Sequence, residues 1–409
     1  MVFFRSHRTI CSRDLAVTDS GGPDVRMLSG YTSLVALLHA ACILSVGGLS
    51  PEFIACQIKK PAGHSPLLDC PQGTIYVSNN ASDSFAHFNS IQEAILSLPP
   101  TGYATILIGE GEYHETINVT RTAPLTLMGQ LPPSSLASVA DPKYPLDVAP
   151  SSTSNLVQVF DTNFVHLGMD DATSAVLIIA PSFNASLIGA GPTGAPLQPL
   201  VGNSDFRAYN IDWSNRAVRQ FCDLPSTSDG HLVFKCLILR MFLRQLSGHV
   251  TDYLFGFGTA WFQNVILANR ACGGGIVAWK GTNLTDAPEN QYGAYISESK
   301  IIRSPDANAT TVTDGLCYLG RPWNDLATTV FLNTFMDQSI RPAGFTPFGG
   351  TRTTILNTTF YAEFNSSGSG GNTTARVPIE HILTAEEAQK FMLEKILGHP
   401  SWIDFEYRF

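Results

Sequence analysis

The amino-acid sequence predicts an all-β fold: a parallel β-helix (solenoid) with short flanking helices at its N- and C-terminal ends. Short β-branched and aromatic runs recur along the chain, each followed by Gly, Asn, Asp or Ser. Several contain Asn beside large apolar residues, as at Asn210, Asn264, Asn333 and Asn357, and the last two are 24 positions apart, which suits one solenoid coil. A β-sandwich would need more Asn-Gly hairpin turns than this sequence offers.

The expected strands are nine such runs. They cover residues 104–119, 126–131, 175–180, 185–190, 207–215, 261–270, 294–304, 329–337 and 354–364.

Two helices are expected outside the strands. In residues 89–100, Ser90 and Glu93 form a capping box, and in residues 383–400 Thr384 and Glu387 form another, with Gly398 near the end. We expect these helices to cap or flank the solenoid and to cover exposed strand edges.

Composition limits the classes of partner. The 409 residues are 44% hydrophobic and 14% charged, with a formal net charge of -9. A chain of this kind can bury a large core, but it has no basic field to hold nucleic acid or an anionic membrane. We therefore expect no nucleic-acid partner and no stable membrane association.

The N-terminal segment predicts export. Residues 1–26 are polar and mixed, and we interpret them as a non-native extension. Met27 opens a segment, approximately 27–55, whose apolar run and small residues are typical of a signal peptide, although a buried helix or a membrane anchor would also fit. Residues 56–409 are then expected to form a single domain, within which 216–250 is an anomalous segment.

Glycosylation signals and cysteines agree with a secreted glycoprotein. Eight N-x-[ST] sequons occur, at Asn80, Asn118, Asn184, Asn283, Asn308, Asn357, Asn365 and Asn372. Outside the segments expected to be removed, six cysteines remain, at 56, 70, 222, 236, 272 and 317. These permit disulfides whose connectivity the sequence does not determine.

Residues suited to chemistry gather in three places, 111–115, 251–256 and 318–325. Asp252 lies in an aromatic stretch and could be a nucleophile or base oriented by a cation, or simply an Asp that caps a turn. Arg321 presents a rigid fork suited to a carboxylate, or a structural ion pair. Trp323 offers a flat face to a sugar ring, or packs in the core.

Together, the stretches GEYHE, TDYLFGFGTAWFQN, YLGRPWND and LTAEEAQKFMLEKILGHPSWIDFEY resemble pectin methylesterases (pectinesterases) of the fungal type. The resemblance extends from about residue 70 to the C-terminus with one gap. It implies a right-handed parallel β-helix that acts as a monomer on methyl-esterified homogalacturonan (pectin), without metal or organic cofactor. It also implies a role in cell-wall modification or pectin catabolism.

The resemblance also implies roles for particular residues. Asp252 matches the nucleophilic aspartate that attacks the ester carbonyl, and Arg321 matches the arginine that holds this carboxylate ionised and oriented. Trp323 matches the tryptophan that stacks on a bound sugar. A family signature with a chiefly structural role matches Gly111, Tyr113 and Glu115.

One family motif has no counterpart. The family carries a second acid in a Gln-Asp-Thr sequence, which protonates the departing methoxide, but this tripeptide does not occur here. The acids and amides of segment 216–250 are not assigned a role; they are Gln220, Asp223, Asp229 and Gln245. Within that segment, FKCLILRMFLRQ could form an amphipathic or membrane-facing helix, or could derive from a frameshifted or mis-spliced message.

Three functions remain open at this stage. The first is a secreted aspartyl esterase that hydrolyses pectin methyl esters. The second is a catalytically impaired β-helix that still binds pectin, which the missing acid favours. The third, glycoside hydrolysis or lyase action, would require paired acids or a calcium cluster, and no Asp-rich motif offers either.

Overall fold

The computed structural model describes residues 50–121, 123–133, 155–163, 174–179, 206–216, 232–234, 237–244, 252–282, 291–305, 307–350 and 352–398. For 50–52, 232–234 and 237–244 only the backbone is described. The chain divides into two compact units, Met1–Gly47 and Gly48–Phe409, and every described residue belongs to the second. No helix in these ranges is long and apolar enough to span a membrane.

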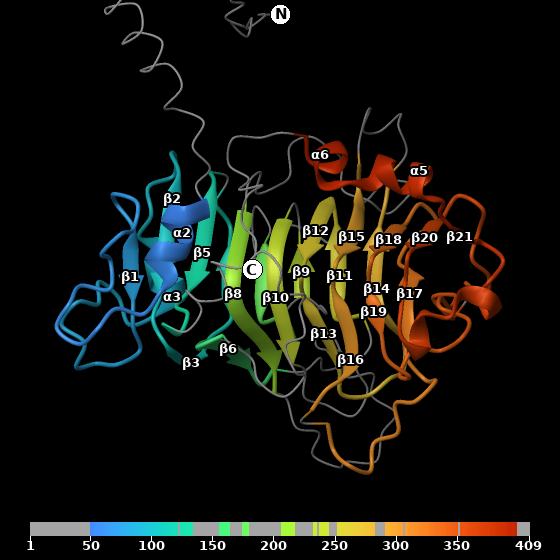
Figure 1. Cartoon of the computed structure of the whole chain (residues 1–409), viewed down its shortest axis with the longest axis horizontal. Coiled ribbons are helices and arrows are strands. Elements are labelled where there is room, and N and C mark those ends of the chain that lie inside the picture. Colours follow the sequence, from blue (N-terminus) through green and yellow to red (C-terminus); the bar gives the residue numbers. More distant parts are fainter. Residues whose placement is uncertain are drawn as a thin grey trace, which may run out of the picture. The chain divides into compact units, whose positions relative to one another are not determined.

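The predicted parallel β-helix is confirmed, because every pairing between the named strands of the described ranges is parallel and successive coils lie side by side (Figure 1). The main path of the larger sheet consists of β1 (Ile75–Val77), β2 (Ala104–Ile108), β5 (Leu125–Gly129), β8 (Phe206–Asn215), β10 (Leu237–Arg244), β12 (Thr259–Gln263), β15 (Gly293–Ser297), β18 (Thr328–Leu332), β20 (Phe360–Phe364) and β21 (Glu380–Ile382).

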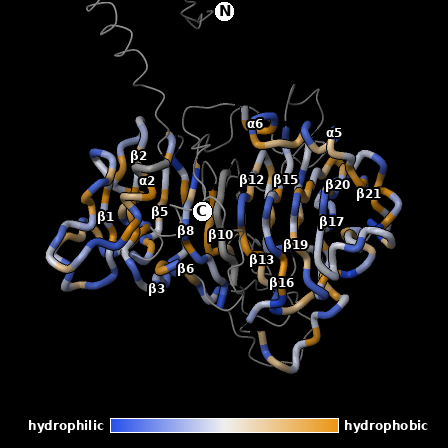
Figure 2. Tube along the Cα trace, viewed as in Figure 1, coloured by the Kyte–Doolittle hydropathy of each residue, from blue (hydrophilic) through white to orange (hydrophobic). Residues whose placement is uncertain are grey.

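Two further rows complete the coils. Branches of the larger sheet contain β3 (Gly111–His114), β6 (Val157–Asp161), β13 (Ile266–Asn269), β16 (Lys300–Arg303) and β19 (Phe335–Met336). The second sheet contains β4 (Ile117–Val119), β7 (Leu177–Ile179), β9 (Leu232–Phe234), β11 (Leu254–Phe257), β14 (Gly275–Lys280) and β17 (Tyr318–Pro322). A coil such as β12, β13 and β14 thus contributes one strand to each row. Apolar residues recur from coil to coil and form a continuous buried core (Figure 2).

A stack of left-handed residues turns the chain between two of these rows. Gln263, Ser297, Leu332 and Phe364 are aligned in register across β12, β15, β18 and β20. The residue that follows each has a positive φ of 48° to 54°; these residues are Asn264, Glu298, Asn333 and Asn365. Asn tolerates this region better than most residues, and Asn365 Nδ2 also donates to Asn333 Oδ1 at 3.0 Å. The conformation therefore repeats where the chain bends.

This stack corrects one expectation about the repeat. The sequence suggested Asn333 and Asn357 as equivalent positions, but the partner of Asn333 in the next coil is Asn365, 32 residues away. Asn357 lies instead in the turn that precedes β20. The turn between β19 and β20 lengthens this coil, so spacing alone selected the wrong asparagine.

Glu298 is the member of the stack least suited to its φ of 48°. We expect Glu298→Asn to raise the free energy of unfolding by about 0.5–1 kcal/mol, because a short amide side chain reduces the left-handed strain. Urea denaturation measures the change. Glu298→Gln is the matched control, since it removes the charge without shortening the side chain. An equal gain in both variants would assign the effect to charge rather than to φ.

Short helices cover the outer face of the main sheet near its two ends (Figure 1). Helix α2 (Ser50–Gln57) packs Phe53 and Ile54 against side chains of β1, β2, β5 and β8. At the other end, α5 (Ala385–Ala388), η4 (Gln389–Phe391) and α6 (Leu393–Ile396) cover β12, β15, β18 and β20. The expected C-terminal run therefore covers a sheet face rather than a strand edge, whereas α2 was not expected from the sequence. Helix α2 also crosses the predicted end of the signal peptide, whose position stays a prediction.

The predicted helix ends are largely confirmed. Ser90 is the N-cap of α3 (Ile91–Leu96) and accepts from Glu93 N. Thr384 and Glu387 form the full capping box of α5. The C-terminal run is not one helix, however, but three short turns, because the N-cap of α6, Met392, has an extended backbone.

Residues 237–244 correct another expectation. The apolar and basic sequence allowed an amphipathic helix, but its backbone is strand β10, paired in parallel with β8 on one side and with β12 and β13 on the other. Pairing on both sides satisfies the backbone groups of a central strand, and this tertiary context overrides the helical pattern.

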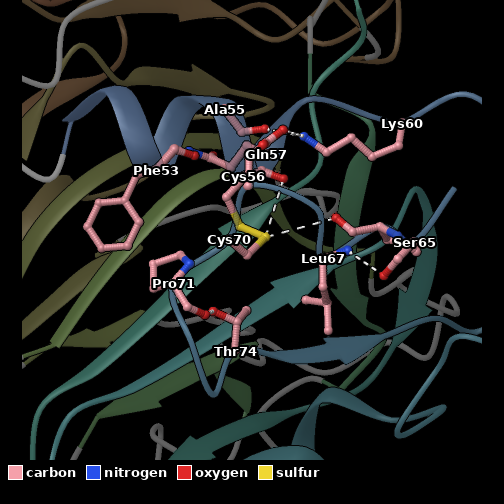
Figure 3. The surroundings of a disulfide bond; sticks show 12 residues. Phe53, Ala55, Cys56, Gln57, Lys60, Ser65, Leu67, Cys70, Pro71 and Thr74 are labelled. Carbon is pink, nitrogen blue, oxygen red and sulfur yellow. Dashed lines mark hydrogen bonds and ion pairs between the residues drawn. A yellow bond between two sulfur atoms is a disulfide. The ribbon is translucent and has the colours of Figure 1, made fainter.

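A disulfide ties α2 to the following segment. Cys56 bonds to Cys70, and Figure 3 shows the bond beside Phe53, Leu67 and Pro71. A second disulfide joins Cys272 and Cys317. The structure thus gives two of the disulfide pairings that the sequence left open. Cys222 and Cys236 lie outside the described residues.

Two further turns, η2 (Ser369–Gly371) and η3 (Thr373–Ala375), lie between Glu363 and Arg376, which belong to a buried charged group at the C-terminal coil. The carboxylate of Glu363 and the guanidinium of Arg376 form an ion pair, with Arg376 Nε 2.5 Å from Glu363 Oε1, and Glu380 Oε2 lies 3.8 Å from Arg376 Nε. Burial and the adjacent Glu363 carboxylate raise the pKa of Glu380. Two acids thus share one arginine, and Glu380 holds a proton.

This group makes stability depend on pH. A pKa that is raised on folding gives stability that is complete below the unfolded pKa and is lost as the pH rises. We therefore expect Glu380→Gln to stabilise the fold relative to wild type by about 1 kcal/mol or more, increasingly from about pH 5 to about pH 9. Thermal unfolding across this range measures the difference. In contrast, Glu363→Gln should destabilise by about 3 kcal/mol, since Arg376 loses its nearer and ionised carboxylate. A pH-independent effect of Glu380→Gln would contradict the shared proton.

Candidate active site

Asp252 lies two residues before β11 and is only 3% exposed. Its φ of 57° places it in the left-handed region, where Asp and Asn are tolerated and where functional residues are often found. The backbone is fixed by Asp252 N, which donates to Gly275 O at 2.5 Å. Gly275 N in turn donates to Asp252 Oδ1 at 3.3 Å. Strand β14 therefore holds both the backbone and the carboxylate of Asp252.

Arg321 supplies the countercharge. The parallel register aligns Phe255, Ala278 and Arg321 across β11, β14 and β17, which brings a residue 69 positions away to Asp252. Arg321 Nε lies 2.9 Å from Oδ1 and 2.8 Å from Oδ2, and Nη2 also contacts Oδ2. A buried carboxylate requires such a paired and hydrogen-bonded cation. The two residues that the sequence singled out are thus in direct contact.

A second contact fixes the guanidinium from the other side. Arg321 Nη1 donates to Phe348 O at 2.9 Å, and the guanidinium carbon lies 4.5 Å from the centroid of the Phe348 ring. Arg352 also lies over this ring, at 5.3 Å, and binds Trp323 O at 2.5 Å and Asp325 Oδ1 at 2.9 Å. Phe348 and Arg352 therefore join the arginine to the turn that carries Trp323.

Trp323 follows β17 and lies next to the ion pair. Its indole contacts the Phe255 ring, with centroids 4.0 Å apart, and Lys280 Nζ lies 3.8 Å from the indole centroid. Ala278 lies between Phe255 and Arg321 in the register. Its small side chain leaves room for the contact between the Phe255 ring and the Trp323 indole. Burial, together with the charge of Arg352, lowers the pKa of Lys280 to about 8. An indole, a lysine and a carboxylate–arginine pair are thus neighbours.

The Cys272–Cys317 disulfide supports this arrangement. Cys272 precedes β14, which carries Gly275, and Cys317 directly precedes β17, which carries Arg321. The bond therefore joins the entries of the two strands whose register positions the Asp252–Arg321 pair.

The family signature lies elsewhere. Gly111, Tyr113 and Glu115 are in and after β3 of the larger sheet, whereas the site lies at β11, β14 and β17 of the second sheet. The Glu115 carboxylate accepts from Ile91 N at 3.0 Å, from Gln92 N at 2.9 Å and from Ser90 Oγ at 2.7 Å. It therefore caps the N-terminus of α3.

The other two signature residues also serve the fold. Tyr113 is buried and donates to Gly109 O at 2.9 Å. Gly111 approaches Asn79 so closely that a Cβ would lie 2.6 Å from Asn79 Oδ1. The structure thus brings Asp252, Arg321 and Trp323 together and leaves the signature outside the site.

We expect Glu115→Ala to lower the free energy of unfolding by about 1–2 kcal/mol, because three donors at the start of α3 lose their acceptor. Chemical denaturation provides the measurement. Glu112→Ala changes a mostly exposed residue of β3 whose ion pair with Arg216 is at the surface, so it should change stability by less than about 0.5 kcal/mol. Equal losses in the two variants would argue against the capping role.

Sequence reasoning missed Lys280, Phe348 and Arg352. Lys280 ends the apolar strand GIVAWK, and a cation in that position was the available signal. The roles of Phe348 and Arg352 can be recognised only from the stacked coils, because both residues contact another coil. The unassigned residues Gln220, Asp223, Asp229 and Gln245 lie outside the described residues.

The fold and the site define a parallel β-helix protein with a carboxylate–arginine centre. Residues 212–399, which include Asp252 and Arg321, match the family model described as Pectinesterase. Two Arabidopsis thaliana proteins are similar: probable pectinesterase/pectinesterase inhibitor 36, at 32% identity over 224 residues, and number 46, at 40% over 267 residues. These matches cover 50% and 60% of this chain, and 42% and 45% of the relatives.

Among solved structures, the pectin methylesterase from Aspergillus niger is similar, with a TM-score of 0.54 and 20% identity over 83% of this chain and 98% of that one. This likeness concerns the fold alone. The match to the pectinesterase family covers residues 212–399, which is less than half of the 409 residues of this chain. The chain spans less than half the length of the two Arabidopsis relatives. The resemblance of this chain to the fungal type of the family stays a prediction.

Proposed function

We propose that this protein hydrolyses the methyl esters of homogalacturonan, producing pectate and methanol. The observation that carries the proposal is the buried Asp252 carboxylate, bound through both oxygens by Arg321 within the matched domain. Arg321 orients the carboxylate and offsets its charge, so that the buried Asp252 carboxylate can act as a nucleophile.

The chemistry proceeds in two steps. A carboxylate oxygen of Asp252 attacks the ester carbonyl; the carbon–methoxy bond breaks, and the methoxide takes up a proton and leaves as methanol. Water then attacks the acyl–enzyme anhydride; the bond between the galacturonate carbonyl carbon and the Asp252 oxygen breaks, which releases the galacturonate carboxylate and restores the Asp252 carboxylate. Of the two protons that the water loses, one replaces the proton taken up from solvent by the methoxide and the other is released to solvent. Neither step requires an oxidant or a reductant. Trp323 is assigned to the sugar ring next to the reacting ester, because it follows Arg321 by two residues.

The proposal includes an extracellular location, where pectin and an oxidising environment are found. The disulfides Cys56–Cys70 and Cys272–Cys317 support it. Five sequon asparagines are exposed and suit glycans on the surface; they are Asn80, Asn308, Asn357, Asn365 and Asn372. The signal peptide and the glycans on these asparagines remain part of this proposal.

A second candidate function is pectin binding without catalysis. The observation that favours it is the lack of a Gln-Asp-Thr sequence, since the leaving methoxide needs a proton donor. Methanol release by the purified chain would exclude this candidate. Retention on a pectin column without methanol release would favour it over the esterase.

We expect Asp252→Asn to lower the rate of methanol release by about 10³-fold or more, because the amide cannot act as nucleophile. Asn tolerates a positive φ, so the fold should persist, and circular dichroism checks this. Asp314→Asn, which changes an exposed acid, is the matched control and should retain wild-type turnover. Turnover by Asp252→Asn close to that of the control would exclude Asp252 as nucleophile.

A further inference from the structure

The last strand of the second sheet, β17, is covered along its outer edge by residues 341–348, which we call the connecting segment. A parallel bridge between Gly320 and Phe345 aligns the segment with the strand. Leu319 N also donates to Gly344 O at 2.7 Å. Strand β17 is therefore held on both sides, by β14 and by the connecting segment.

The C-terminal end of the connecting segment holds Arg321. Phe348 O accepts a hydrogen bond from Arg321 Nη1 at 2.9 Å, and the Phe348 ring centroid lies 4.5 Å from the guanidinium carbon. The other two nitrogens of the guanidinium, Nε and Nη2, contact the Asp252 carboxylate. Because a guanidinium is planar and rigid, the position of one nitrogen constrains the direction of the other two. The position of Phe348 therefore affects how Arg321 orients the carboxylate.

The N-terminal half of the connecting segment packs on a buried cation, Arg376. Arg376 Nη1 donates to Pro342 O at 3.1 Å, and Val377 N donates to Ala343 O at 3.1 Å. Gly344 lies so close to the same side chain that a Cβ would be 2.7 Å from Arg376 Cδ. The segment and Arg376 are therefore packed in direct contact.

Two buried carboxylates fix Arg376 in turn. Arg376 Nε lies 2.5 Å from Glu363 Oε1, and Arg376 Nη2 lies 3.2 Å from Glu363 Oε2. Glu380 Oε2 lies 3.8 Å from Nε, and Nη2 also donates to Gly370 O at 2.8 Å. Moving a buried arginine away from such a set would leave charged and polar groups unpaired, which is far more costly than breaking a surface ion pair. Arg376 is thus a fixed point for the connecting segment.

We propose that Arg376 is a positioning residue of the candidate active site: it fixes the connecting segment, and the segment fixes the guanidinium of Arg321 and hence the direction of the Asp252 carboxylate. Arg376 acts through the backbone of residues 341–348 and takes no part in the chemistry itself. This inference rests on the proposed function, because a nucleophile requires a defined direction of attack.

Gly344→Ala tests this connection, since the added Cβ would push the segment away from Arg376. Gly315→Ala is the matched control: the two glycines have φ values of 69° and 67°, but a Cβ on Gly315 would meet no atom of the described residues within 4 Å. We expect Gly344→Ala to lower kcat for methanol release about tenfold or more and to change KM by less than about twofold, because a misdirected nucleophile still allows the substrate to bind. Gly315→Ala should match wild type.

Arg376→Lys is a second variant, which keeps the test open if circular dichroism shows that Gly344→Ala does not fold. Lysine keeps the charge beside Glu363 but cannot reproduce the rigid fork that also donates to Pro342 O, so kcat should again fall about tenfold. Wild-type kcat in either folded variant, an equal loss in Gly315→Ala, or a loss that appears only in KM would overturn the proposal.

An NMR measurement separates the positioning role from the proposed activity. In protein that contains isotope-labelled arginine, the Nε–H resonance of Arg321 is the one that Arg321→Lys removes. In Gly344→Ala this resonance should move toward its position in Asp252→Asn, because the charge-assisted contact with the carboxylate weakens, and in Gly315→Ala it should not move. If no protein releases methanol but the resonance moves as expected, the esterase proposal fails and the positioning role stands. An unchanged resonance in folded Gly344→Ala would refute the positioning role whatever the activity.

Discussion

The parallel register of stacked coils is the constraint on which the site depends. Each strand of the second sheet is aligned with its neighbour residue by residue, so Phe255, Ala278 and Arg321 form one row across three coils. This row brings together Asp252 and Arg321, which lie 69 positions apart in the chain. A slip of one residue would turn Arg321 to the other face of the sheet and leave a buried carboxylate without its cation. The register therefore determines the geometry of the candidate site.

Several local features protect that register. The left-handed residues from Asn264 to Asn365 repeat one bend in successive coils and limit where the chain can turn. The Cys272–Cys317 disulfide joins the entries of β14 and β17. Helices α5 and α6 cover an outer sheet face that would otherwise be wet. These features lie outside the Asp252–Arg321 pair, yet each restricts the sliding of one coil on the next.

The sequence predicted the elements better than their partners. Strand composition and the asparagines at 210, 264 and 333 gave the β-helix, because the residue types that favour strands and left-handed turns act locally. Glu298 and Asn365 were not recognised as members of the same stack, since coil lengths vary and Glu carries no left-handed signal. Residues 237–244 favoured a helix by pattern, but pairing on both sides makes them a strand.

The same limit applies to the site. Asp252, Arg321 and Trp323 were predicted by resemblance rather than by spacing, since no local rule places an arginine 69 positions from its carboxylate. Phe348 and Arg352 had no signal, because their role is to contact side chains and carbonyls of another coil. The link that a sequence pattern cannot supply is the alignment of distant segments.

Net charge is a poor guide to what such a site selects. The chain carries a formal charge of -9, which by itself suggests that an anionic polymer would be repelled. Charges in water act over about 8–10 Å at ordinary ionic strength, so a bound sugar responds to the groups beside it rather than to the total. Around Trp323 those groups are Lys280, Arg321 and Arg352, against Asp252 and Asp325. The total of -9 therefore says little about the local potential at the indole.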